Sequence, residues 1–161
     1  MVIRRLIAGL SQACLFLAAL GAALMAVLIS YVVVQRFFWH QTPHWAEELP
    51  RFILVWSAFL GGVACTYRRS HLTAGLLSTI LPPGALQNFV RKVGDVSMIF
   101  GLAVLGYAGW ELSELTMGQP LPAIGVDAGF VYLALPVACA AMVIVQLGQL
   151  FGLVSDEAKE S

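Results

Sequence analysis

Apolar residues form four long runs along the chain, separated by short stretches that gather polar, charged and proline residues. The runs cover residues 6–34, 46–67, 93–112 and 129–153. They lack the alternation of apolar and polar positions that is typical of membrane barrel strands. Because about 20 helical residues cross the ~30 Å apolar core of a bilayer, each run can span it once its flanks are included. The pattern predicts an all-α integral membrane protein with four transmembrane helices in one domain, residues 1–161.

The first run is longer than a bilayer requires and carries no charged residue. Its length predicts that the helix is tilted or protrudes from the membrane. It does not fit a cleaved signal peptide, because it is about twice the usual apolar length and continues into the aromatic and charged border "YVVVQRFFWH".

Small residues recur inside the runs. They occur in "AALGAALMA" of the first run, "AFLGGVAC" of the second and "FGLAVLGYAG" of the third. Membrane helices approach closely where glycine, alanine and serine lie at the contact. We therefore expect close helix contacts at these positions.

The segment between the second and third runs is too short and too interrupted to span a membrane. Leu72, Leu76 and Ile80 recur at helical spacing, and Pro82 and Pro83 end the pattern. We predict a short helix over residues 72–81 that lies in the membrane interface. A plain loop is the alternative.

Composition agrees with a membrane protein: 60% of the 161 residues are hydrophobic and 11% are charged. The formal net charge of zero gives no indication of a nucleic-acid partner, so membrane lipids are the expected surroundings. Seven of the nine basic residues fall on one side of the membrane if the helices alternate: Arg4, Arg5, Arg68, Arg69, Arg91, Lys92 and Lys159. The excess of basic residues in cytoplasmic segments then predicts that both termini are cytoplasmic.

Charged residues gather where the second helix begins. On a helix, Glu47 and Glu48 lie four and three residues before Arg51, so either carboxylate could pair with the guanidinium. Such a pair would lower the cost of an arginine near the membrane. A second interpretation is that one of these groups turns outward to a partner protein, and the two interpretations are compatible.

Two tryptophans near this border are expected to have different surroundings. Trp45 is at the depth where tryptophan ordinarily anchors a helix among lipid headgroups. Trp56 lies about a turn and a half further in than Arg51, so we expect it to pack against a neighbouring helix.

The histidines raise the possibility of a haem site, since some four-helix membrane anchors bind haem through paired histidines. His40 and His44 fall on one side of the membrane and His71 on the other, so no pair on opposite helices shares one depth. Pro43 breaks the helix that would align His40 with His44 for a metal. The cysteines also lack the spacing of a metal site. We expect no cofactor, no metal and no catalytic residue. A haem- or quinone-associated anchor of a redox complex is the alternative function.

Acidic residues also bear on function. Glu111 and Glu114 fall at a helix end, and the first helix has no carboxylate. We therefore expect no charged group and no transport site within the membrane, which favours an accessory subunit over a pump or an enzyme.

The segment "WAEELPRFILVWSAFLG", residues 45–61, followed by "RRSH", resembles the small membrane subunit of tripartite ATP-independent periplasmic (TRAP) transporters, the DctQ-like family. The later "GQPLPAIGV" and "VYLALPV" are similar to that family's third loop and fourth helix, so the resemblance covers residues 10–153. It is carried by Trp45, Glu48, Arg51, Trp56, Gly61 and His71. Gly75 and Asp127 depart from the family pattern, which usually has an acidic residue and often a proline there.

The resemblance implies a bacterial inner-membrane system for sodium-coupled uptake of organic acids. A periplasmic substrate-binding protein captures the acid, and a large membrane subunit carries it by an elevator motion. This chain would be the small permease subunit, a scaffold without a substrate site. The resembling residues, together with Glu47, would form its structural motif and its interface with these partners.

Overall fold

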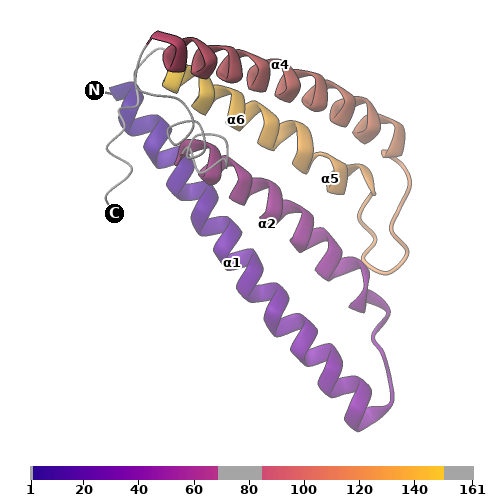
Figure 1. Ribbon diagram of the computed structural model, residues 1–161. Helices are drawn as coiled ribbons and strands as arrows, with labels where there is room; N and C mark the ends of the chain where they lie inside the picture. The colour runs from indigo at the N-terminus through magenta and orange to yellow at the C-terminus, as the bar shows by residue number, and fades with distance from the viewer. Residues whose placement is uncertain (1, 69–84, 151–161) are drawn as a thin grey trace.

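The structure, a computed structural model, describes residues 2–68 and 85–150 (Figure 1). Its elements in chain order are α1 (Val2–Trp39), the 3-10 helix η1 (His44–Ala46), α2 (Glu48–Tyr67), α4 (Ala85–Thr116), α5 (Gly129–Tyr132) and α6 (Ala134–Leu150). Four segments are long and apolar enough to cross a membrane: Arg5–Trp39, His44–Tyr67, Lys92–Thr116 and Gly129–Leu150. The predicted all-α membrane fold with four spanning helices is confirmed.

The helix bounds differ from the predicted ranges in two instructive ways. The first and third helices are longer than their apolar runs, since they also include the residues that flank each run on both sides. The fourth run is divided into α5 and α6 at Leu133. Pro136 explains the break, since it lacks an N–H and its ring clashes with the carbonyl four residues earlier. The helix predicted over residues 72–81 lies outside the described residues.

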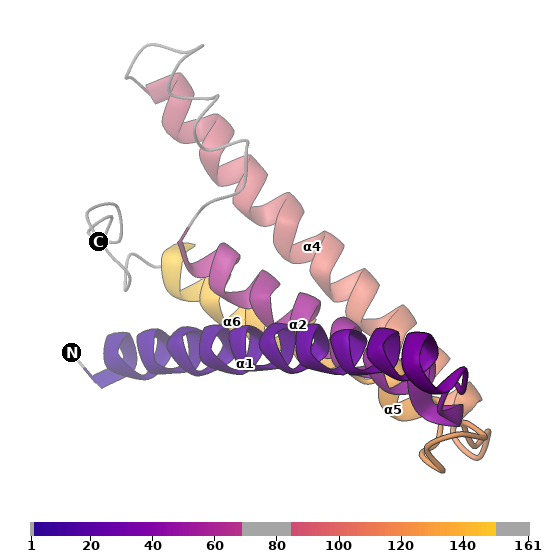
Figure 2. The same ribbon diagram turned by 90° about the horizontal axis from the view of Figure 1, so that it is seen from below.

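The helices form an open layer in the order α1, α2, α6, α4. Figure 1 shows α4 beside α6, α6 beside α2, and α2 beside α1, and each of these pairs is in contact. Figure 2 shows the same molecule from below, with α4 leaning away from the line of α1. Among the described residues, α1 and α4 do not contact each other. The fold is therefore a fan of helices and not a closed bundle.

The contact between α1 and α2 follows a regular stripe along α1. Its less exposed positions include residues 7, 11, 14, 18, 21, 25, 28, 32 and 35, which alternate spacings of four and three. This is the periodicity of helices that pack at a small crossing angle with a left-handed twist. Several of the residues are small, including Ser11, Cys14, Ala18 and Gly21, so the two helices approach closely.

Glycines make the helix contacts close, as expected from the sequence. A Cβ atom at Gly21 would collide with Ser57 of α2. A Cβ atom at Gly106 would lie 3.2 Å from Cys139, and one at Gly109 would lie 2.9 Å from Leu135. The small-residue faces of α1 and α4 are therefore the faces that α2 and α6–α5 cover.

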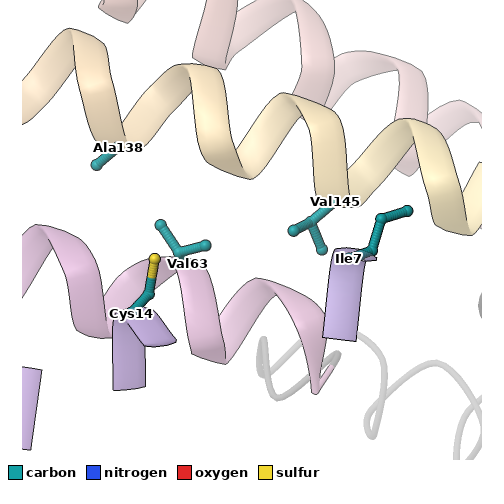
Figure 3. Close-up of a cluster of buried hydrophobic side chains, with 5 residues drawn as sticks. All are labelled: Ile7, Cys14, Val63, Ala138 and Val145. Atoms are coloured by element: carbon teal, nitrogen blue, oxygen red, sulfur yellow. The ribbon is translucent and has the colours of Figure 1, made fainter. Parts of the chain in front are cut away.

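One cluster of buried apolar side chains joins three of the helices (Figure 3). It consists of Ile7 and Cys14 from α1, Val63 from α2, and Ala138 and Val145 from α6. Val63 and Val145 are completely buried. Most other large apolar side chains are exposed, as expected for a chain whose surface meets lipid or another membrane protein.

Candidate functional site

Two connecting segments, residues 40–47 and 117–128, lie at the same end of the helix layer, which we call the loop end (Figure 1). Four of the residues singled out from the sequence are gathered there: Trp45, Glu47, Glu48 and Arg51. Trp56 lies about one and a half turns beyond Arg51 on α2, while Gly61 is further inside and packs against Ala18 of α1. His71 lies outside the described residues.

Residues 117–128 fold into a compact turn of their own. The N–H of Leu121 donates to the carbonyl of Val126, and the N–H of Gly125 donates back to the carbonyl of Leu121, both at 2.9 Å. Gly118 and Gly125 have φ angles of 83° and 66°, which glycine adopts without strain. The loop thus has an ordered backbone before any contact with the helices is considered.

Asp127 has a structural role in this turn. Its backbone pairs with Pro120 in an isolated antiparallel bridge, and its carboxylate Oδ2 accepts a 3.3 Å hydrogen bond from the N–H of Gly118. The aspartate closes the base of the loop. Its departure from the family pattern therefore leaves a well-formed turn.

Glu48 fastens the loop to α2. Its Oε2 accepts a 2.9 Å hydrogen bond from the backbone N–H of Ala123. The expected pairing of Arg51 with Glu47 or Glu48 is absent from the described part of the chain. Glu47 precedes the first turn of α2 and is exposed, and the carboxylate of Glu48 is directed to the loop instead.

Arg51 is left exposed on the surface of α2. Glu47 is also exposed, so the start of α2 presents a cation and an anion that no described residue neutralises at ion-pair distance. Exposed charges of this kind act chiefly on the encounter with a charged partner.

Trp56 fixes the short helix α5. Its indole Nε1–H donates to the carbonyl of Phe130 at 3.1 Å, as expected for a side chain that packs against a neighbouring helix. From the other side, the hydroxyl of the buried Ser113 donates to the carbonyl of Gly129 at 2.9 Å. Two consecutive carbonyls of α5 are thus held by α2 and α4, which positions the segment that follows the loop.

Trp45 lies between α1 and a shallow apolar groove. Its ring stacks on that of Tyr31, with centroids 6.1 Å apart and planes 10° apart. The groove encloses about 440 Å³ and is lined by Trp45, Leu49, Phe52, Ala123, Ile124 and Val126. Glu48 binds the backbone of Ala123, one of the lining residues, and so connects the loop side of the groove to α2.

A second polar contact lies toward the other end of the layer and corrects one sequence prediction. Asp95 of α4 is inside a candidate membrane span, where no charged group was expected. Its Oδ1 accepts a 2.8 Å hydrogen bond from Nε2 of Gln146, a buried residue of α6. The sequence signal was a lone carboxylate after Lys92 and a glutamine in an otherwise apolar run.

Gln149 makes a related contact one turn further along α6. Its Nε2 lies 3.0 Å from the carbonyls of Thr66 and Tyr67, at the end of α2. These carbonyls are in the last turn of α2, where the helix provides no N–H donor four residues later. Gln149 therefore caps α2 from a neighbouring helix.

The described side chains of the site bind backbone groups and line an apolar groove. In residues 2–68 and 85–150, no group of three or more His, Cys, Asp or Glu side chains is placed to hold a metal ion. The polar side chains of the site hold backbone groups of the loop and of α5. These hydrogen bonds hold the surface of the loop end in one arrangement.

Comparison with known proteins agrees with this architecture. Residues 25–156 match the family described as tripartite ATP-independent periplasmic transporters, DctQ component. A putative TRAP transporter small permease protein of Haemophilus influenzae is 24% identical over 94% of this chain and 90% of its own length. The sialic acid TRAP transporter small permease protein SiaQ of Vibrio cholerae is 25% identical over 83% of this chain and 76% of its own.

A third relative is a longer protein. The isethionate TRAP transporter permease protein DctMQ of Oleidesulfovibrio alaskensis is 30% identical over 68% of this chain, and the match covers 18% of that protein.

Proposed function

The chain belongs to the DctQ component family of tripartite ATP-independent periplasmic transporters, and from this premise we propose how it serves such a transporter. It is a small permease subunit with several membrane-spanning helices. We propose that it binds the large membrane subunit as a scaffold and that its loop end helps to dock the periplasmic substrate-binding protein. The transporter would take up an organic acid with sodium.

Contact with the large subunit is supported by the open helix layer. Large apolar side chains are exposed along both outer helices, including Phe16 and Val27 of α1 and Phe100 of α4. The relative named DctMQ supports the same contact, because a segment similar to this chain is part of one longer permease protein there. The large subunit would cover part of the layer, and lipid would cover the rest.

One observation carries the docking proposal: Glu48 holds the 117–128 loop on α2 beside the exposed charges of Glu47 and Arg51. A surface made from segments far apart in the sequence is thereby kept in one arrangement. With both termini in the cytoplasm, as the basic residues predict, this surface would face the periplasm, where a binding protein approaches.

The proposed substrate class rests on the named relatives. Sialic acid and isethionate, which appear in the names of two of them, are both organic acids. We propose that this chain contributes no substrate site. We therefore assign selection of the acid to the partner proteins, and we place the complex in the bacterial inner membrane.

The docking role can be tested with Arg51→Ala in the complex reconstituted with its large subunit. Uptake would be measured as the concentrations of binding protein and salt are varied, with the yield of assembled complex measured alongside. We expect normal assembly and a requirement for more binding protein, because exposed charges act on association rate and its salt dependence.

Lys92→Ala is the matched control. It removes one exposed positive charge from the other end of the layer, so uptake should depend on binding protein as in the unmodified complex. If Arg51→Ala lowered assembly and left uptake per assembled complex unchanged, Arg51 would be purely structural and the docking role would be rejected.

A further inference from the structure

The last turn of α1 carries Arg36, Phe37, Phe38 and Trp39, and the helix stops where His40 adopts a φ angle of 52°. Phe37, Phe38 and Trp39 are 77%, 75% and 63% exposed. These are among the most exposed large apolar side chains of the described residues, and they are consecutive.

Their directions indicate what surrounds them. Successive residues of a helix are rotated by about 100°, so four consecutive side chains point to all sides of α1. A partner helix or a protein groove would cover one face and leave the opposite face in contact with water or lipid. Three of these directions carry exposed aromatic side chains and the fourth carries Arg36, so a continuous medium such as lipid fits this turn better than a single partner surface. Aromatic rings are enriched where that medium is the border between acyl chains and headgroups.

The length of α1 leaves two placements for this turn. Arg5–Trp39 has 35 residues, a length of about 52 Å at 1.5 Å per residue. A bilayer with its headgroups is about 40–45 Å thick. The helix therefore either projects into water or tilts by about 30–40°, which is within the observed range. Projection would place three large aromatic side chains in water, whereas tilt retains them at headgroup level.

We propose that the last turn of α1, residues 36–39, is a lipid anchor that holds this helix tilted. It lies in the leaflet opposite the start of α1, with the three rings among the upper acyl chains and glycerol groups. The Arg36 guanidinium extends to a lipid phosphate, as long basic side chains do near helix ends. This inference is independent of the proposed function, because it requires neither the large subunit nor the binding protein.

The depth of Trp39 can be measured directly. The full chain would be labelled with 5-fluorotryptophan, placed in lipid nanodiscs and studied by fluorine NMR, both alone and with its large subunit. The Trp39→Phe variant identifies the Trp39 signal. Spin-labelled lipids, with the label on the headgroup or high on the acyl chain, would be compared with a water-soluble paramagnetic chelate.

We expect near-complete loss of the Trp39 signal with either lipid label and little change with the chelate, in both preparations. Trp56 is half-buried, and its indole donates a hydrogen bond to the carbonyl of Phe130. Its fluorine signal in the same spectrum serves as the control for a less accessible tryptophan. Loss with the chelate alone would show that α1 projects into water and would overturn the proposal. Protection from every probe in the complex would also overturn it, since a protein would then cover the turn.

Discussion

The carboxylate of Glu48 accepts a hydrogen bond from the backbone N–H of Ala123, which lies 75 residues later in the chain. The first residue of α2 is thereby joined to the middle of the 117–128 loop. Since the neighbouring Trp56 bonds to α5 behind that loop, α2 holds the segment at two points.

Replacing Glu48 should loosen the loop. Glu48→Ala removes the acceptor of a charge-assisted hydrogen bond, which contributes about 1–2 kcal/mol at a half-buried site. Amide hydrogen exchange in residues 117–128 should then become about tenfold faster, because exchange follows the free energy of local opening. Glu48→Gln keeps an oxygen acceptor and should have a smaller effect. Glu47→Ala, at an exposed position, is the control and should leave exchange in the loop unchanged.

Adding a side chain to Gly109 should separate α4 from α6. Gly109→Val places atoms against Leu135 and Pro136, and forced overpacking costs about 1–3 kcal/mol. Gly101→Val is the matched control on the same helix, because nothing lies within 4 Å of a Cβ atom there. The free energy of unfolding in mixed detergent micelles should fall for Gly109→Val relative to Gly101→Val. Equal values would show that α4 and α6 do not pack as described.

The hydrogen bond between Asp95 and Gln146 should appear as a coupling energy. Interhelical polar pairs in membranes average about 0.6 kcal/mol in double-mutant cycles, with values up to about 1.7 kcal/mol. We expect Asp95→Ala and Gln146→Ala to couple within this range in unfolding measurements. Asp95→Ala combined with Ser113→Ala is the control pair, because distant sites without shared partners are additive. Additivity of the first pair would mean that the bond contributes nothing to stability.

The distribution of basic residues predicts the topology. A reporter that is active only in the periplasm should be silent when fused after Ser161 and active when fused after Gln119. The reverse pattern would place the loop end in the cytoplasm and would remove the basis for docking a periplasmic protein there. Reporter activity and fusion-protein levels would be measured together, so that low expression is not mistaken for a cytoplasmic location of the reporter.

The local features of this fold could be predicted from the sequence. Four spans follow from apolar length, and the close contacts of Gly21 and Gly109 follow from small residues at helix surfaces. The stripe on α1 was also visible, since Ser11, Cys14 and Ala18 recur at spacings of three and four. These signals depend on neighbours in one helix, so one sequence is sufficient.

Contacts between distant segments could not be predicted in the same way. Glu48 has an adequate partner nearby in Arg51, so no sequence rule directs it to a backbone N–H of another loop. The order of the helices is likewise undetermined by their connections, because short links permit both a closed bundle and an open layer. Asp95 is different, since a lone carboxylate in an apolar run is visible in the sequence, although its partner Gln146 is not indicated there.

Because α1 and α4 do not contact each other, the four described spans enclose no lumen between them. The helices form a layer with two exposed faces and not a channel. A transport path that runs along one face of this layer must be completed by another protein on its opposite side. Mutations on either face of the layer should therefore change transport by changing the contact with that protein. Vesicles that contain this chain alone should remain impermeable to the solute.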